Sequence, residues 1–372
     1  MRYQTDETAR SIMGGTCPMF LSKAKQALAR RADNVLVEKY IKGPPGSLEQ
    51  DPEKIEAQIR WYHEIAERYE APELFSGEGA FFPAPATPKP TTQRGKKGAL
   101  ELWWPSGYEP FNEEVADDYM ENPYNHTVRA RLLTTSHGSN LAATRPPAII
   151  FIHGYRGGAL DMEQLLWPLS SWLEAGFDVA MIVLPHHGQR KLPEASRPPY
   201  PGFDPRITIE GLRQAVWDTR ALIAWLLDRG APHVGVCGMS LGGLVNSLML
   251  GAEENLSFAV PTVPLISFAA WGEDHGTLLG RGEQQKRYKE ALQRVTRVID
   301  PLSRKSLVPA ERVGVVAGKN DRINRVHHAR SIAAHTGGEL VLIPGGHLLQ
   351  FGLGDAFGEL GRRFHAPHPD SE

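Results

Sequence analysis

Cysteine, net charge and long apolar runs are all scarce in this sequence. Two cysteines in 372 residues cannot form a disulfide framework. Cys237 stands in an apolar run, which predicts a buried thiol in a reducing compartment. With 41 Lys and Arg against 43 Asp and Glu, the formal charge is −2, so no broad field attracts nucleic acid or an anionic membrane. We therefore expect a small or neutral substrate and no nucleic-acid partner.

Membrane anchors are also missing from the sequence pattern. Residues 1–15 hold no continuous apolar core of signal-peptide length, and no later segment approaches the roughly 20 apolar residues that cross a bilayer. These absences predict a cytoplasmic protein without stable membrane insertion. Residues 19–43 are compatible with a helix, and a solvated face is favoured for it over a membrane-surface role. The basic face of that helix comprises Lys23, Lys25, Arg30 and Arg31.

The pattern of residues 1–95 predicts a helical N-terminal extension followed by a proline-rich strap. Residues 52–69 place apolar side chains at helical spacing, with Asp51 as the N-cap and Pro52 in the first turn. Residues 83–98 combine proline, threonine and charge without periodicity, which favours a linker or an extended strap over a surface. The extension is either part of the core or a separate arm for partner binding, and a homodimer is the partner expected of such an arm.

Residues 96–372 show the alternation of strands and helices that is typical of an α/β domain. Residues 99–104 and 126–135 alternate apolar and polar side chains, as antiparallel strands with one buried face do. From residue 148, continuous apolar strands alternate with helical segments, which predicts a mostly parallel central sheet flanked by helices. Residues 266–308 break this order with a polar, helical segment too long for a connecting loop, and we expect a lid insertion there.

Gly238-Met239-Ser240-Leu241-Gly242 is the sharpest motif, a G-x-S-x-G between an apolar strand and a predicted helix. Such a turn forces its middle residue into a strained conformation and needs small neighbours. It exposes the Ser240 hydroxyl at the carboxyl edge of the sheet. The following helix directs its N-terminal N–H groups at charge that develops there. Ser240 is therefore the candidate nucleophile.

With this motif the sequence resembles the α/β-hydrolase superfamily over about residues 126–365. The resemblance implies a triad in the chain order Ser, acid, His. Asp321 follows the strand RVGVVAG within G-x-x-D-x-I and is the expected acid, although an Asp at such a turn also commonly caps the next helix. His347 follows the last strand in PGGH and is the expected general base. A triad of this kind needs no metal and no cofactor.

The resemblance also implies an oxyanion hole. His153-Gly154-Tyr155-Arg156-Gly157 follows an apolar strand and resembles the superfamily's HG-x-x-G loop. The backbone N–H groups of Tyr155 and Leu241 are then the expected donors to the oxyanion. In this arrangement His153 is structural and is not a base.

Other polar residues near the carboxyl edge are candidates for substrate binding. The segment 185–191 resembles the P-x-x-G-x-R-K loop of a poorly characterised subgroup of the superfamily, and its spacing fits no zinc signature. An arginine fork suits a substrate carboxylate or phosphate, with pairing to Glu273 or Asp274 as the slightly favoured alternative. Trp271, in the lid, either lines an apolar acyl pocket or packs in the core. The substrate-binding candidates are Arg156, His186, His187, Arg190 and Trp271.

These residues point to a serine esterase that cleaves a small-molecule carboxylic ester through an acyl-enzyme on Ser240. Thioester, amide and C–C bond hydrolysis use the same triad and stay open as alternatives. A non-catalytic binding member of the fold is the remaining class. The intact triad and oxyanion motifs argue against it.

Overall fold

The computed structural model describes residues 19–42, 48–75, 80–135 and 145–366. Within these ranges nine strands form one sheet in the order β1-β2-β3-β5-β4-β6-β7-β8-β9. The first three strands are antiparallel to their neighbours, and β4 to β9 run parallel to one another. The strands are β1 Thr91–Arg94, β2 Leu100–Pro105, β3 Thr127–Leu133, β4 Ala148–Ile152, β5 Asp178–Ile182, β6 Val234–Met239, β7 Leu256–Thr262, β8 Gly314–Gly318 and β9 Glu339–Ile343.

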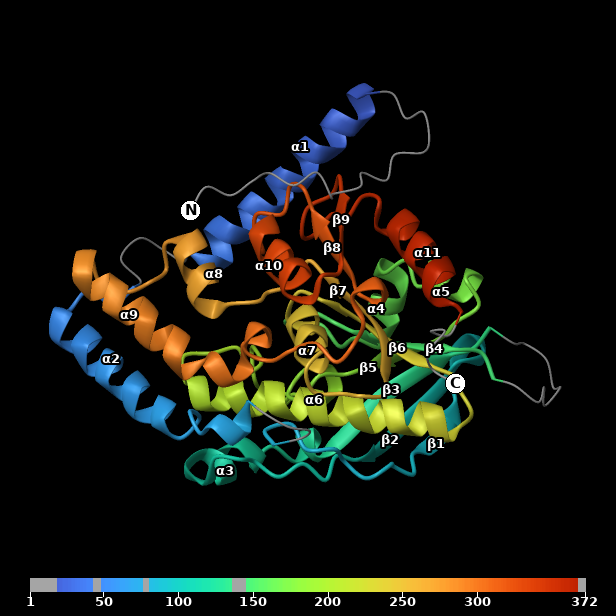
Figure 1. The fold of residues 1–372 in the computed structure, drawn as a ribbon, viewed down its shortest axis with the longest axis horizontal. Helices are drawn as coiled ribbons and strands as arrows, with labels where there is room; N and C mark the ends of the chain where they lie inside the picture. Colours follow the sequence, from blue (N-terminus) through green and yellow to red (C-terminus); the bar gives the residue numbers. More distant parts are fainter. Residues whose placement is uncertain (1–18, 43–47, 76–79, 136–144, 367–372) are drawn as a thin grey trace.

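Helices cover both faces of this sheet (Figure 1). They are α1 Met19–Leu36, α2 Pro52–Glu67, α3 Glu113–Met120, α4 Leu160–Leu166, α5 Ser170–Glu174, α6 Pro205–Asp228, α7 Leu241–Met249, α8 Phe268–His275, α9 Gly282–Val295, α10 Val326–Thr336 and α11 Leu353–Phe364. A π-helical turn, Val37–Ile41, continues α1, and 3₁₀ turns span Pro72–Leu74, Lys96–Gly98, Pro123–His126, Gly188–Arg190, Arg297–Ile299, Pro301–Ser303 and Ala310–Arg312. The predicted mostly parallel central sheet flanked by helices is confirmed.

Strands buried on both faces explain the continuous apolar runs in the sequence. Along β4, Ile150 and Ile152 face the hydrophobic cluster beneath α6, α7 and α10, whereas Ile149 and Phe151 face the cluster beneath α5 and α11. Successive side chains of a strand point to opposite faces, so a strand covered on both faces needs apolar residues at every position. The predicted period-two pattern is seen in the antiparallel strands β2 and β3, where buried and less buried side chains alternate.

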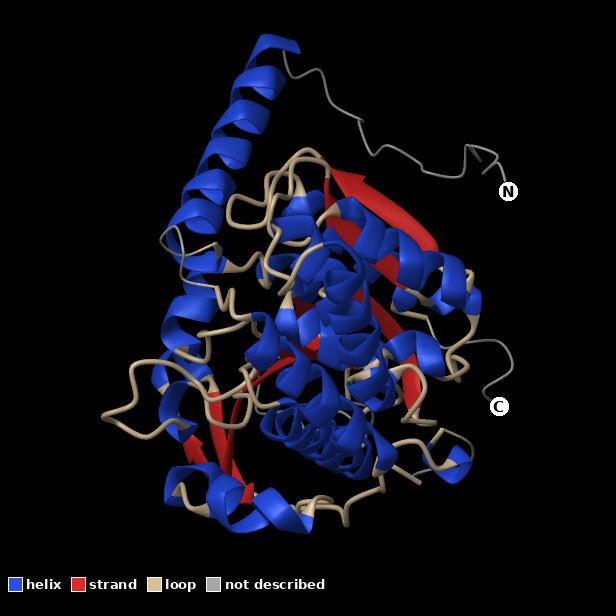
Figure 2. Cartoon of the chain, turned by 90° about the vertical axis from the view of Figure 1, so that its left-hand side faces the viewer, coloured by secondary structure: helices blue, strands red, loops and turns tan. Residues whose placement is uncertain are grey.

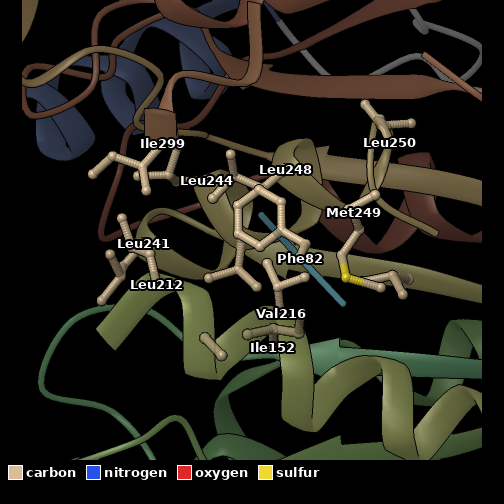
Figure 3. Packing of buried hydrophobic residues seen from close by; sticks show 14 of the residues in the cluster. Phe82, Ile152, Leu212, Val216, Leu241, Leu244, Leu248, Met249, Leu250 and Ile299 are labelled. Atoms are coloured by element: carbon tan, nitrogen blue, oxygen red, sulfur yellow. The ribbon is translucent and has the colours of Figure 1, made fainter. Parts of the chain in front are cut away.

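The larger cluster fixes α7, the helix that follows the candidate nucleophile. Figure 3 shows Leu244 and Leu248 of α7 close to Leu212 and Val216 of α6, with the ring of Phe82 among them. All five side chains are at least 97% buried. Because buried side chains pack at the density of organic crystals, the start of α7 is held rigidly against the sheet.

The N-terminal extension packs on the predicted lid. α2 begins at the predicted cap, because Asp51 Oδ1 accepts a hydrogen bond of 2.9 Å from Glu53 N and Pro52 occupies the first turn. Its buried face, which includes Ile59 and Tyr62, packs against α9. The predicted lid segment thus contributes α8 and α9 to one hydrophobic cluster with the extension.

The end of the predicted strap lies in the sheet itself. Thr91 to Arg94 form the edge strand β1 and pair with β2. The predicted domain boundary near residue 95 therefore falls between two neighbouring strands. Among the described helices, none combines the length and apolarity that a bilayer crossing requires.

We expect Ile59→Ala to lower the free energy of unfolding by about 2–5 kcal/mol, because it leaves a cavity between α2 and α9. Ile59 is only 4% exposed. Urea unfolding followed by circular dichroism measures the change. Leu165→Ala, at a residue that is 82% exposed, is the control and should change stability by less than about 0.5 kcal/mol. Equal stabilities of the two variants would show that α2 is not part of the core.

Candidate active site

The chain turns sharply from β6 into α7 at Ser240. Ser240 has φ 56° and ψ −110°, a conformation that costs a non-glycine residue about 1–3 kcal/mol. A Cβ atom on Gly238 would fall on the carbonyl oxygen of Gly242, and one on Gly242 would fall on the carbonyl oxygen of Ile152. Only glycine fits either flanking position, so the G-x-S-x-G pattern follows from the close approach of β6, α7 and β4.

Two hydrogen bonds join the three predicted triad residues. His347 Nε2 lies 3.0 Å from Ser240 Oγ, and His347 Nδ1 lies 2.8 Å from Asp321 Oδ2. Because a carboxylate only accepts, the Nδ1 atom carries the proton and Nε2 is free to accept from the serine hydroxyl. The loops after β6, β8 and β9 supply the three side chains, since parallel neighbouring strands end at the same edge of the sheet.

The Asp321 carboxylate is fully engaged. Its Oδ1 atom accepts hydrogen bonds of 2.8 Å from the backbone N–H groups of Ile323 and Asn324, while Oδ2 faces His347. The side chain is 5% exposed. Asp321 therefore does both things that the sequence suggested. Its Oδ1 atom caps the following turn, and its Oδ2 atom contacts the imidazole.

Asn324 is a site residue that the sequence patterns did not reveal. Its Nδ2 atom lies 3.4 Å from Ser240 Oγ and donates to the carbonyl oxygen of Val263 at 2.9 Å. The side chain is 4% exposed. The only local indication in the sequence is its position three residues after Asp321, because the turn that presents Asp321 also brings Asn324 close to Ser240.

Charge around His347 determines its protonation. Burial disfavours the imidazolium, but the charge and hydrogen bond of Asp321, together with the charge of Asp33 on α1, outweigh that effect and raise the pKa of His347 above its ordinary value. His347 is 6% exposed. The direction of this shift makes the imidazole a stronger base than a free histidine side chain.

The predicted oxyanion loop lies next to Ser240, the candidate nucleophile. A Cβ atom on Gly154 would lie 3.4 Å from Ser240 Cβ, which places the backbone of the loop after β4 against the serine. His153 holds this loop, because its Nε2 accepts from Leu184 N at 3.0 Å and its Nδ1 donates to the Gly154 carbonyl at 2.8 Å. The neighbouring Tyr155 N–H, with the Leu241 N–H in the first turn of α7, stays the predicted donor pair.

Arg190 is not available to a substrate, so its predicted binding role is wrong. The side chain is fully buried, and its Nη1 atom bonds Asp218 Oδ2 on α6 at 2.8 Å. Its guanidinium also donates to the carbonyl oxygens of Val183 and Asn125. The carboxylate partner is therefore neither of the two that the sequence suggested.

The two adjacent histidines are also turned inward. His186 is 5% exposed and contacts the side-chain amides of Asn122 and Asn125 through its two ring nitrogens. His187 is fully buried, and its Nδ1 donates to the Pro185 carbonyl at 2.8 Å. Burial lowers the pKa of both imidazoles, that of His186 to about 3. The prediction that they bind substrate is corrected to a structural role in the loop.

Arg156 and Trp271 keep their predicted roles as untested candidates. Arg156 is exposed beside Tyr155, and its φ of 63° turns the chain at the rim of the oxyanion loop. Trp271 lies on α8, packs partly on the large hydrophobic cluster and has its ring centroid 4.6 Å from that of His275.

One group among the described residues has metal-ligand geometry. Ligand atoms of Asp274, His327 and His328 lie within 4.8 Å of one another, between α8 and the start of α10. The same carboxylate also pairs with Arg325, whose Nη1 lies 3.4 Å from Asp274 Oδ1. Ile266 N–H points at His328 Nδ1, which leaves the proton of a neutral ring on Nε2, the atom that a metal would need. This arrangement suits an ion-pair cluster better than a metal centre.

Known protein sequences are similar to part of this chain. No protein-family model matches the chain. Uncharacterized proteins of Mycobacterium tuberculosis strains CDC 1551 and H37Rv are each 32% identical over 209 residues, 54% of this chain and 49% of the relative. The match therefore spans about half the length of these curated relatives.

Solved structures with a similar fold include two acetyl xylan esterases. An acetyl xylan esterase from Paenibacillus sp. R4 superposes with a TM-score of 0.53 at 16% identity, covering 90% of this chain and 99% of that one. Acetyl xylan esterase 1 from Thermoanaerobacterium sp. JW/SL YS485 superposes with a TM-score of 0.51 at 15% identity, covering 84% of this chain and 94% of that one. At these identities the likeness concerns the fold, and the α/β-hydrolase fold that the motifs predicted is confirmed.

We expect Arg190→Ala to lower the free energy of unfolding by about 3–5 kcal/mol, because the substitution leaves the Asp218 carboxylate buried without its partner. Urea unfolding again measures the difference. Arg156→Ala, at an exposed arginine of the neighbouring loop, is the matched control and should stay within about 0.5 kcal/mol of the parent. A stable Arg190→Ala variant would restore the hypothesis of a substrate contact.

We expect NMR titration of the His347 ring to give a pKa above the ordinary value of about 6.5. Asp321→Asn removes the negative charge that stabilises the imidazolium, so the pKa of His347 should fall and the neutral ring should persist to lower pH. The His347→Gln spectrum assigns the resonance. Asp117→Asn, an exposed acid on α3, should leave the titration unchanged. A His347 pKa that does not respond to Asp321→Asn would contradict the hydrogen-bonded pair.

Proposed function

We propose that this chain, which has the α/β-hydrolase fold, is a serine hydrolase that cleaves a carboxylic ester through an acyl-enzyme on Ser240. The observation that carries the proposal is the 3.0 Å contact between Ser240 Oγ and His347 Nε2, at a strained turn between β6 and α7. A serine hydroxyl is a weak nucleophile until a base removes its proton. The Nε2 atom of the imidazole is within reach of that proton. The ring's own N–H proton, on Nδ1, is directed at Asp321.

Each residue then has one task in acylation. As Ser240 Oγ attacks the ester carbonyl carbon, its proton passes to His347 Nε2, and Asp321 stabilises the imidazolium that forms. The carbonyl oxygen becomes an oxyanion, which the N–H groups of Tyr155 and Leu241 would stabilise, at about 3 kcal/mol per donor. The imidazolium returns its proton to the departing alcohol, and the ester bond breaks. Water repeats the sequence on the acyl-enzyme and releases the acid.

Esters are the first substrate class to test. Two proteins with the same fold carry the name acetyl xylan esterase, which supports an ester over other acyl compounds without identifying the alcohol. Thioester, amide and C–C bond hydrolysis follow the same proton transfers and are outcomes of the test. A small ester-like substrate, a cytoplasmic location and a homodimer through residues 1–95 stay predictions.

We expect a fluorophosphonate probe to label Ser240, because its phosphorus is attacked by an activated serine, and tryptic mass mapping identifies the modified residue. Ser240→Ala and His347→Ala should abolish labelling. They should also reduce the hydrolysis of a p-nitrophenyl ester series by a factor of at least about 10³, and the series gives the acyl-chain preference. Circular dichroism verifies that the variants are folded.

Ser331→Ala is the control, since Ser331 lies on the exposed side of α10 and bonds the His327 carbonyl. It should label and turn over like the parent. A folded parent protein that takes no label and hydrolyses no ester would favour the non-catalytic class. Label on a serine other than Ser240 would also contradict the proposal.

A further inference from the structure

A buried carboxylate from the N-terminal extension reaches the loops that carry the triad. Asp33, on α1, is fully buried. Its Oδ2 atom accepts hydrogen bonds from His347 N at 2.8 Å and Arg322 N at 3.1 Å, and its Oδ1 accepts from Leu348 N at 3.0 Å. Two of these donors belong to the loop after β9 and one to the loop after β8. One side chain thus joins the loop of the base to the loop of the acid.

We propose that Asp33 is a positioning residue of the active site, which holds the backbone of His347 at the distance from Asp321 that their hydrogen bond needs. This role deepens the proposed function, because it matters for catalysis only if His347 is the base for Ser240. A carboxylate can accept several N–H donors at once, and bonds to an ionised acceptor are stronger than those between neutral groups. No neutral side chain of similar size offers the same set of acceptors.

The second glycine of the PGGH motif fits this role. A Cβ atom on Gly346 would lie 2.7 Å from Asp33 Oδ2 and 3.3 Å from Ala29 Cβ. Gly346 does not have a positive φ, so an alanine there would be compatible with the backbone. Glycine is therefore needed at this position because the Asp33 carboxylate of α1 occupies the space where a side chain would lie.

Neighbouring residues on the same face of α1 contact the same two loops. Arg30 Nη2 donates to Asn320 Oδ1 at 2.9 Å, and Asn320 in turn donates to the carbonyl oxygen of Pro344 at 3.0 Å. Asn34 Oδ1 accepts from Arg322 Nε at 3.4 Å. Residues spaced by three and four positions share one face of a helix. The predicted solvated basic face is thus in part a docking face, through Arg30.

α1 lies at the surface of the fold, and its Asp33 side chain is buried beside the two loops. Figures 1 and 2 show α1 running along the outside of the molecule. The charged groups that act on His347 among the described residues are Asp321 and Asp33, while the nearby Arg30 and Arg322 are directed at Asn320 and Asn34. Loss of the Asp33 charge should therefore reach the imidazole as well as the backbone.

The test compares Asp33→Asn with Glu38→Gln. Asparagine keeps the size of the side chain but removes the charge and turns an amide donor towards backbone N–H groups. Glu38 is an exposed acid in the turn that continues α1, where it pairs with Lys42, so Glu38→Gln controls for the loss of one negative charge. Both full-length variants are assayed for kcat and KM on p-nitrophenyl acetate and for the NMR titration of His347.

Asp33→Asn should lower kcat by about ten-fold or more, since small displacements of a catalytic group have effects of this size. KM should change little, because Asp33 is buried beneath the loops and does not face the substrate. The pKa of His347 should fall as well, whereas a merely structural loss would leave the titration of the folded protein unchanged. Glu38→Gln should match the parent in all three measurements.

Gly346→Ala is the second variant and serves if Asp33→Asn does not fold. Its methyl group would displace the Asp33 carboxylate while leaving the charge in the protein. It should therefore lower kcat, and the double variant with Asp33→Asn should be no worse than the more damaged single variant. An unchanged kcat and an unchanged His347 pKa in a folded Asp33→Asn or Gly346→Ala protein would overturn the inference.

Failure of the proposed function gives a different result. In that case the parent protein neither takes the fluorophosphonate label nor hydrolyses the ester, and the His347 titration decides alone. A lower pKa in Asp33→Asn would then support the positioning of the imidazole by α1. An unchanged pKa would overturn it.

Discussion

The hydrogen bond between His347 and Asp321 is the interaction on which the site depends. It forms because β8 and β9 are parallel neighbours in register, with Gly318 opposite Ile343, so that the loops after them leave the sheet side by side. Both side chains are almost fully buried, where a hydrogen bond is stronger than in water and an unpaired charge is costly. The strained turn at Ser240 places its hydroxyl 3.0 Å from this pair, and in the proposed mechanism the imidazole oriented by Asp321 accepts the hydroxyl proton.

Local patterns were sufficient for the residues that follow directly on apolar strands. Ser240, Asp321 and His347 each stand at such a place, and the structure brings them into hydrogen-bonding distance. The same logic failed for His186, His187 and Arg190, because it assumed that polar residues at the carboxyl edge face outward. Their partners, Asn122, Asn125 and Asp218, come from other elements, and no spacing in the sequence indicates that these side chains meet.

The contacts of the N-terminal extension were likewise not predictable from local sequence patterns. Its helices were predicted, yet the contacts that matter for the site were not, since Asp33 and His347 are 314 positions apart. A lone acid on a basic helix gives almost no signal by itself. The packing of α2 on α9 likewise joins the extension to the predicted lid, so two segments that are far apart in the sequence form one helical layer. The described parts of residues 19–75 thus contact the loops of Asp321 and His347 in addition to enlarging the core.

Mass spectrometry of the protein during turnover of p-nitrophenyl acetate tests the central claim most directly. The account predicts that one acetyl group accumulates on the peptide that contains Ser240, that it disappears when the ester is exhausted, and that His347→Ala prevents its formation. Hydrolysis without acetylation of the protein, or an acetyl group on a different residue, would contradict the proposed acyl-enzyme on Ser240.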